Sequence, residues 1–166
     1  MRAAVITISD RSFRGKRPDA SGPELVTLLG AAGATLHEHA LIPDDRALIA
    51  STLVRLVEAG CDVIATTGGT GISPRDVTPE ATLEVIERRL PGIEQAIFLK
   101  STTKTPFAML SRAVAGVRGK TLILNFPGSP KAARECFGVV APLLDHILML
   151  LRDEDPHAAH SARKTA

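Results

Sequence analysis

The chain has 166 residues, of which 45% are hydrophobic and 23% charged, and its formal net charge is +2. These values are typical of a soluble globular domain with a sizeable core. The near-neutral balance excludes a global field that would attract nucleic acid or an anionic membrane. There is no tryptophan or tyrosine, which leaves few rings for stacking on single-stranded nucleic acid. We therefore expect neither nucleic acid nor a membrane as a partner.

The start of the chain and its cysteines indicate a cytoplasmic protein. A strand pattern begins almost at once, without the basic start, apolar stretch and cleavage site of a signal peptide. The most apolar stretch, residues 139–151, is too short to span a bilayer and contains a proline and polar residues. Cys61 and Cys136 stand apart without C-x-x-C spacing, which favours reduced thiols over a disulfide framework.

Strand-like and helix-like runs alternate in the first half of the chain. The predicted elements, in order, are a buried strand at 4–9, a helix at 23–32, a looser strand at 34–42, a helix at 44–59 and a strand at 62–67. In the second of these helices, apolar residues recur on one face at Ile49, Leu53, Leu56 and Val57. Gly33 and Gly60 end the two helices, as glycine commonly does.

The second half continues the alternation. Its predicted elements are a helix starting at Thr78-Pro79-Glu80, a helix at 93–100, an antiparallel strand at 112–117, a buried strand at 121–125 and a last helix from Ser129-Pro130 to 151. Thr78 is predicted to cap its helix, with Pro79 at the first helical position. This alternation predicts an α/β domain with a mostly parallel sheet covered on both faces. We expect one domain over residues 1–151 and a polar, frayed tail at 152–166.

The segment 62–82, DVIATTGGTGISPRDVTPEAT, is the most informative part of the chain. An apolar run leads into three glycines, and Arg75 and Asp76 follow just before a helix start. The glycines fit neither G-x-x-x-x-G-K-[ST] nor G-x-G-x-x-G, so a tight surface turn explains them equally well. A phosphate site is favoured by the carboxylate of Asp76 and by hydroxyl groups on Thr66, Thr67, Thr70 and Ser73.

Three further segments follow predicted strands, at the edge where open α/β sheets bind ligands. They are Ser9-Asp10-Arg11, residues 42–45 and residues 125–130. Taken alone, Asp44 is most simply a helix cap, and Ser129-Pro130 is ordinary helix initiation. At the same sheet edge as Asp76, however, Asp44 indicates a magnesium site with phosphate ligands. The helix start near Lys131 then indicates an anion site.

Nearly the whole chain, from residue 6 to about residue 151, resembles the small molybdopterin adenylyltransferases, which are related to the G domain of gephyrin. The most specific matches are TTGGTGISPRDVTPEAT (66–82), MLSRAVAGVRGKTLILNFPGSPKA (109–132) and LIPDD (41–45). The loop at 12–21, which contains Asp19, matches less closely, and Phe126 stands where leucine is more usual.

The resemblance implies a three-layer α/β/α sandwich, a homotrimer, and transfer of AMP from Mg-ATP to the terminal phosphate of molybdopterin with release of pyrophosphate. The product would pass to a molybdate-inserting enzyme. Asp44 and Asp76 match the two functional aspartates of the family, and we predict both as catalytic residues and Mg²⁺ ligands. The predicted substrate-binding residues are Ser9, Asp10, Thr67, Gly68, Gly69, Thr70, Gly71, Ser73, Arg75, Pro127, Gly128, Ser129 and Lys131.

The chemistry of the substrates narrows the role of the aspartates. A phosphate monoester has its second pKa at about 6, so the attacking oxygen is already ionised at neutral pH. An aspartate, with a pKa of about 3.9, would be a poor base in any case. We predict both aspartates as metal holders. Two alternatives stay open: a non-catalytic trimeric paralogue that binds pterin or nucleotide, and a nucleotide hydrolase. Intact aspartates and phosphate turns favour the transferase.

Overall fold

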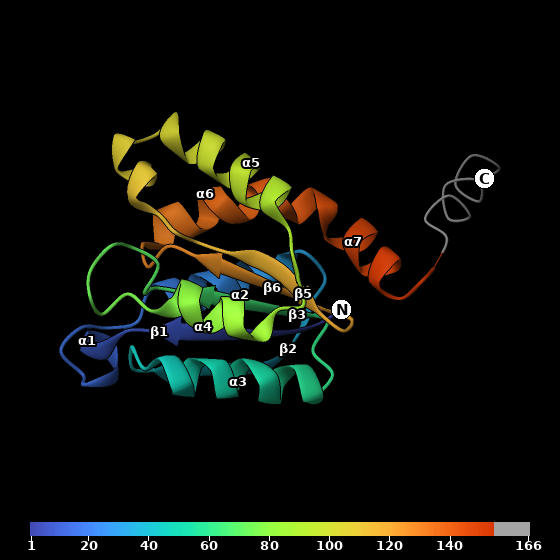
Figure 1. Cartoon of the computed structure of the whole chain (residues 1–166), viewed down its shortest axis with the longest axis horizontal. Helices are drawn as coiled ribbons and strands as arrows, with labels where there is room; N and C mark the ends of the chain where they lie inside the picture. Colours follow the sequence, from blue (N-terminus) through green and yellow to red (C-terminus); the bar gives the residue numbers. More distant parts are fainter. Residues whose placement is uncertain (155–166) are drawn as a thin grey trace.

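The computed structural model describes residues 1–154 and places a six-stranded sheet at the centre of the fold (Figure 1). The strands are β1 (Arg2–Ile8), β2 (Thr35–Ile42), β3 (Val63–Thr67), β4 (Arg88–Arg89), β5 (Ala115–Arg118) and β6 (Thr121–Phe126), in the spatial order β2-β1-β3-β6-β5-β4. β2, β1, β3 and β6 are parallel, and β5 and β4 add an antiparallel edge. The carboxyl ends of the parallel strands therefore meet at one edge of the sheet.

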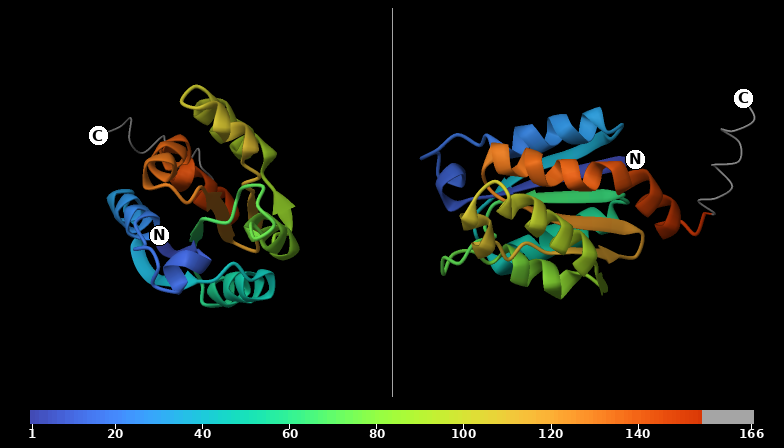
Figure 2. Two further views of the ribbon diagram at one scale, coloured as in Figure 1. Left: turned by 90° about the vertical axis from the view of Figure 1, so that its left-hand side faces the viewer. Right: turned by 90° about the horizontal axis from the view of Figure 1, so that it is seen from above.

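Helices cover both faces of the sheet, which confirms the predicted three-layer α/β/α sandwich (Figure 2). They are α1 (Asp10–Phe13), α2 (Ser21–Ala31), α3 (Arg46–Glu58), α4 (Thr78–Val85), α5 (Pro91–Thr102), α6 (Pro130–Val140) and α7 (Leu144–Leu151), with 3-10 turns η1 (Pro106–Leu110) and η2 (Ala141–Leu143). α2, α5, α6 and α7 pack on one face, and α3 and α4 on the other. Within residues 1–154, no helix is long and apolar enough to cross a membrane.

Alternation along β1 shows why both faces are covered. Ala3 and Val5 pack toward the α2 and α6 side, whereas Ala4, Ile6 and Ile8 pack toward α3 and α4. Successive side chains of a strand point to opposite faces. A continuous apolar run therefore marks a strand buried on both faces, as the sequence predicted.

Each helical layer buries the residues that recur at helical spacing. Ile49, Leu53 and Leu56 of α3 are fully buried, although Val57 is only half-buried. On the opposite face, the ring of Phe126 lies 6.1 Å from that of Phe137 on α6, at an interplanar angle of 52°. Phe126, the departure from the usual leucine, is thus accommodated as a core residue.

The last helix is not continuous, contrary to the sequence prediction. It is divided into α6, η2 and α7, because Pro142 lacks a backbone N–H and its ring crowds the preceding turn. α1, β4 and η1 were not predicted, since each is too short to show a hydrophobic period. The predicted strand at 112–117 begins only at Ala115. Most of the predicted tail, residues 155–166, lies outside the described part of the chain.

Asn125, the last residue but one of β6, is the centre of a buried polar network. Its Nδ2 donates to Thr66 Oγ1 at 2.9 Å and to Thr82 Oγ1 at 3.0 Å. Its Oδ1 accepts from the backbone N–H of Val114 at 3.1 Å. The side chain thus joins β3, α4 and the segment before β5, and no sequence pattern indicated this.

Asn125→Ala is expected to lower the free energy of unfolding by about 3 kcal/mol, because it leaves the Val114 N–H and the two threonine hydroxyls without partners. Urea denaturation at matched protein concentration measures the change. Thr103→Ala, which removes an exposed local bond to Lys100 O, is the control and should alter stability by less than about 0.5 kcal/mol. Equal, small effects of both substitutions would show that the network contributes little.

Candidate functional site

A polar cavity of about 340 Å³ lies where β1, β2, β3 and β6 end. Segments after all four strands contribute to it, as the sequence predicted from their positions. The predicted site residues that line it are Ser9, Asp10, Asp44, Thr67, Gly68, Gly69, Ser73, Arg75, Asp76 and Gly128. The other predicted residues lie apart from it: Thr70, Gly71 and Pro127 line a second, apolar cavity, and Ser129 and Lys131 are exposed at the start of α6.

The backbone of the loop after β3 requires glycine at two successive positions. Gly68 has φ +96° and Gly69 has φ +61°, values that favour glycine. A Cβ on Gly68 would lie 2.2 Å from the carbonyl oxygen of Ile8. The loop after β3 therefore approaches the end of β1 so closely that only glycine fits.

Two threonine hydroxyls and one amide hold this loop in place. Thr67 Oγ1 donates to Pro127 O at 2.9 Å, and Gly68 N donates to Phe126 O at 3.1 Å. Thr78 Oγ1 donates to Gly68 O at 2.9 Å. The prediction that Thr78 caps α4 is thus wrong: Val77 is at the cap position, and the Thr78 hydroxyl fastens the loop instead.

Several consecutive amides of the loop have no hydrogen-bond acceptor within residues 1–154. The N–H groups of Gly69, Thr70 and Gly71 form no hydrogen bond with any residue of the described chain. Successive free amides in a glycine-rich loop form an anion-binding concavity. Of these residues, Gly69 lines the polar cavity, so its amide, rather than that of Gly68, is available to a phosphate there.

Asp44 is freed for the cavity because Asp45 caps α3. Asp45 Oδ1 accepts from Leu48 N at 2.9 Å, whereas Asp44 Oδ2 accepts from the backbone N–H of Asp10 at 2.8 Å. Burial raises the pKa of Asp44, and the neighbouring carboxylates of Asp10 and Asp76 raise it further. The simple helix-cap interpretation of Asp44 is therefore not what the structure shows.

Arg75 is paired within the protein. Its Nε donates to Asp10 Oδ2 at 2.9 Å, and its Nη2 donates to the carbonyl oxygen of Asp44 at 2.9 Å. This ion pair holds the pKa of Asp10 below its usual range. The guanidinium thus links the segments after β1, β2 and β3, and much of its charge is compensated by Asp10.

Asp76 completes a group of three carboxylates. Its Oδ2 accepts from Ser73 N at 2.8 Å, and a Cβ on Gly71 would lie 2.9 Å from that same oxygen. Within residues 1–154, no donor reaches the buried Asp10 Oδ1, so the site has an unsatisfied oxygen as well as like charges close together. Oxygen ligands of this kind suit a hard cation such as Mg²⁺.

The site is not a preassembled metal cage. Within residues 1–154 there is no group of three or more His, Cys, Asp or Glu side chains arranged to hold a metal. Mg²⁺ typically takes only one or two protein carboxylates and completes its coordination with water and substrate phosphates. Asp44 and Asp76 therefore fit a magnesium ion that arrives with a phosphate ligand.

Arg112 is a site residue that the sequence analysis missed. Its Nε donates to Gly71 O at 2.7 Å, its Nη2 donates to Asp76 O at 2.6 Å, and its Nη1 pairs with Glu80. Its backbone N–H donates to Thr70 O at 2.9 Å. One residue therefore holds the glycine loop from Thr70 to Asp76. Only its place in the matched segment 109–132 gave any signal.

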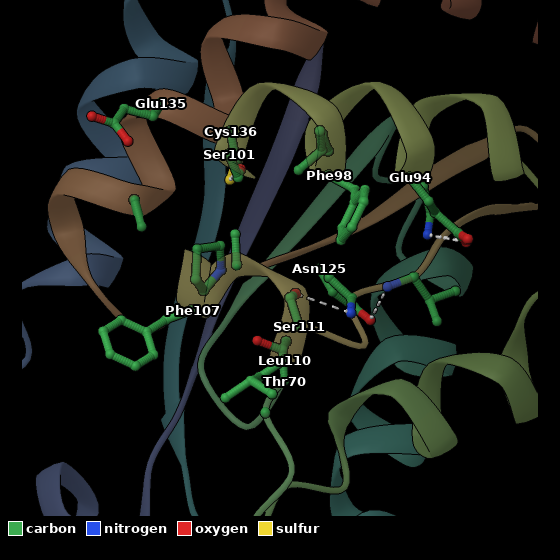
Figure 3. Close-up of a pocket in the computed structure, with 18 of the residues that line it drawn as sticks. Thr70, Glu94, Phe98, Ser101, Phe107, Leu110, Ser111, Asn125, Glu135 and Cys136 are labelled. Atoms are coloured by element: carbon green, nitrogen blue, oxygen red, sulfur yellow. Dashed lines mark hydrogen bonds between the residues drawn. The ribbon is translucent and has the colours of Figure 1, made fainter. Parts of the chain in front are cut away.

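On the other side of the glycine loop, α5, η1 and α6 enclose an apolar cavity of about 320 Å³ (Figure 3). The cavity is lined by the side chains of Phe98, Phe107, Leu110 and Cys136, and Asn125 lies at its inner wall. Thr70 and Gly71 separate it from the polar cavity, since they line the apolar one while Gly68 and Gly69 line the other.

A parallel α/β sheet with a polar cavity at its strand ends is the arrangement of ligand-binding α/β domains. The family model described as "Probable molybdopterin binding domain" matches residues 4–146. The chain therefore belongs to this molybdopterin-binding domain family.

Related proteins and structures agree with that assignment. The chain is 44% identical over 138 residues to the Escherichia coli molybdopterin adenylyltransferase, covering 81% of this chain and 71% of the relative. It is 42% identical to the Drosophila melanogaster molybdenum cofactor synthesis protein cinnamon over 90% of its length, but it spans only 25% of that protein. The structure of the Thermus thermophilus molybdopterin biosynthesis enzyme MoaB is 44% identical, with a TM-score of 0.86 over 92% of this chain and 97% of that one.

Proposed function

We propose that this protein is a molybdopterin adenylyltransferase of molybdenum cofactor biosynthesis. It transfers AMP from Mg-ATP to the terminal phosphate of molybdopterin and releases pyrophosphate. The observation that carries this proposal is the polar cavity, which Asp44, Asp76 and Gly69 line together, Gly69 being the first of the loop residues with a free amide. Relatives named molybdopterin adenylyltransferase, 38–44% identical to the chain, support it.

In the proposed reaction, the charged and the uncharged groups of the cavity have different roles. The phosphate of molybdopterin attacks as a dianion, so no side chain has to remove a proton from it. The main barrier is repulsion between this dianion and the triphosphate. Asp44 and Asp76 would hold Mg²⁺, which when bound neutralises phosphate charge and stabilises the departing pyrophosphate. The free loop amides orient the phosphates by donating hydrogen bonds.

The amides and the carboxylates have complementary roles. The amides of Gly69 to Gly71 carry only partial positive charge, and Asp10 already compensates Arg75. A triphosphate therefore brings more negative charge to the cavity than these groups offset. Burial and the neighbouring carboxylates raise the pKa of Asp44, and a cation that arrives with the nucleotide would offset that cost of its charged form. Metal and nucleotide are thus expected to bind together.

The pH dependence of the rate tests whether the substrate phosphate attacks as a dianion without a protein base. At saturating magnesium, activity is expected to stay constant from about pH 8 to about pH 7 and to fall near pH 6, as the substrate phosphate gains its second proton. Because the pKa of Asp44 is raised, acidification neutralises it sooner than an ordinary aspartate and weakens magnesium binding in the same direction. Saturating magnesium removes that second effect. A flat rate profile down to about pH 5 would contradict an attacking dianion.

We also propose that residues 1–151 act as one cytoplasmic domain, assemble as a homotrimer and deliver the product to a molybdate-inserting enzyme. Exposed apolar side chains support self-association. Five of them lie on α5 and η1, where Phe98, Leu99, Phe107, Met109 and Leu110 are 41–76% exposed. α7 contributes less to such a surface: Leu148 is buried in the chain's own core, and Leu150 is exposed.

Pyrophosphate release from Mg-ATP, measured with and without molybdopterin, tests the proposed reaction. Release that depends on molybdopterin, with adenylyl-molybdopterin as product, is expected. Molybdopterin binding without release would indicate the non-catalytic paralogue. ATP breakdown in the absence of molybdopterin would indicate a nucleotide hydrolase.

A further inference from the structure

Two arginines on the loop around α1 carry positive charge that the protein leaves unpaired. Arg11 and Arg17 both line the polar cavity. Neither guanidinium forms a hydrogen bond or an ion pair with any residue between 1 and 154. By contrast, Arg75 is engaged by Asp10, and Lys131 lies outside the cavity. The free cationic charge of the site therefore comes from this loop.

The charge balance of the cavity makes these arginines important. Its lining includes four aspartates and three arginines. The aspartates are Asp10, Asp19, Asp44 and Asp76. A phosphate-bearing substrate would therefore meet net negative charge even with every arginine in place. Guanidinium groups bind phosphate oxygens through paired, charge-assisted hydrogen bonds, which makes Arg11 and Arg17 the suited partners.

Asp19 fixes the end of the loop two residues beyond Arg17. Its Oδ2 accepts from Thr7 Oγ1 on β1 at 2.6 Å and lies 3.2 Å from His39 Nε2 on β2. Its Oδ1 accepts from Gly22 N at 3.0 Å. The Asp19 side chain is only 10% exposed. The loop is therefore joined to two strands of the sheet at the point where Arg17 enters the cavity.

Glycine makes this anchor possible, and internal bonds close the loop. A Cβ on Gly22 would lie 2.2 Å from both Thr7 Oγ1 and His39 Nε2, so no other residue leaves room for the contact. Within the loop, the backbone N–H of Lys16 donates to Arg11 O at 2.9 Å. Arg11 thus begins a closed turn, and Arg17 lies between that turn and the anchored Asp19.

We propose that Arg17, together with Arg11, binds a substrate phosphate group in the polar cavity, and that Asp19 is the positioning residue for Arg17. This inference rests on the proposed function for the identity of the substrates, which are the nucleotide polyphosphate and the phosphate of molybdopterin. It moves the phosphate-binding charge from Arg75 and Lys131, the cations that the sequence predicted, to the loop around α1.

Calorimetric binding of Mg-pyrophosphate and of molybdopterin, each alone, tests the inference. Arg17→Gln is expected to weaken binding of one of these ligands about tenfold. Lys16→Gln is the control, because it removes the same charge from the same loop without lining the cavity. A loss confined to Mg-pyrophosphate assigns Arg17 to the nucleotide, and a loss confined to molybdopterin assigns it to the pterin phosphate. No loss, or an equal loss in both variants, overturns the inference.

Asp19→Asn tests the positioning role. The variant should weaken the same ligand as Arg17→Gln, and the double variant should bind no more weakly than Arg17→Gln alone. Additive losses would show that Asp19 does not act through Arg17. The binding assay needs no turnover, so it separates two failures. A wild-type protein that binds phosphate through Arg17 but releases no pyrophosphate refutes the transferase alone, whereas an active enzyme indifferent to Arg17→Gln refutes the inference alone.

Discussion

Asp76→Asn is expected to lower molybdopterin-dependent pyrophosphate release about a hundredfold or more, while molybdopterin binding changes little. Asparagine keeps the size of the side chain and an oxygen that can accept from Ser73 N, so the loop retains its form. It loses the negative charge that would hold magnesium. Repulsion between the phosphate dianion and the triphosphate then persists at the moment of reaction. Initial rates over a magnesium titration measure the loss.

Asp45→Asn is the matched control for this experiment. It removes the same charge one residue from Asp44, and asparagine caps a helix about as well as aspartate does. Its rate should therefore stay within about twofold of the wild-type rate. If Asp76→Asn also turned over at a near-normal rate at saturating magnesium, Asp76 would not be a metal holder.

The fold was predictable for the elements in which burial makes apolar residues recur along the sequence in a regular pattern. β1, β3 and β6 are buried on both faces and appear in the sequence as short apolar runs, so their existence and approximate ends were correct. α3 was recognisable because Ile49, Leu53 and Leu56 repeat on one face. The prediction of one continuous last helix was wrong because the apolar spacing continues on both sides of Pro142. Only the proline, which lacks a backbone N–H, indicates that the helix is interrupted there.

The candidate site was predictable in its position but not in its bonding. Strand ends and glycines placed Asp44, Asp76 and the loop at one edge of the sheet, because parallel strands gather their carboxyl ends there. Adjacent aspartates gave no way to tell which one caps α3. Arg75 meets Asp10 from 65 residues away, and such a long-range pair leaves no local pattern. The charge that sequence assigned to Arg75 is therefore partly compensated in the fold.

Arg112→Gln is expected to lower turnover roughly tenfold to a hundredfold, the range found when a residue that orients metal ligands is removed. Glutamine cannot donate at once to Gly71 O, Asp76 O and Glu80, so the glycine loop loses hydrogen bonds that hold it in place. Asp76 then samples positions in which it cannot hold the cation. The magnesium concentration for half-maximal rate should therefore rise, while the KM for molybdopterin stays near its wild-type value.

Arg89→Gln separates this effect from the loss of an arginine–glutamate ion pair elsewhere in the fold. Arg89 pairs with Glu94 at 2.8 Å on the antiparallel edge and contacts no part of the glycine loop. The Arg89 side chain is 54% exposed, and Glu94 keeps its bond from the Ala115 N–H when Arg89 is replaced, so the substitution should change neither rate nor magnesium dependence. A merely structural role for Arg112 would lower thermal stability and leave the magnesium requirement unchanged. A raised requirement that returns toward normal in Arg112→Lys, which restores the charge but not the fork of donors, would instead assign the effect to charge. Failure of lysine to restore it would assign the effect to the geometry of the guanidinium.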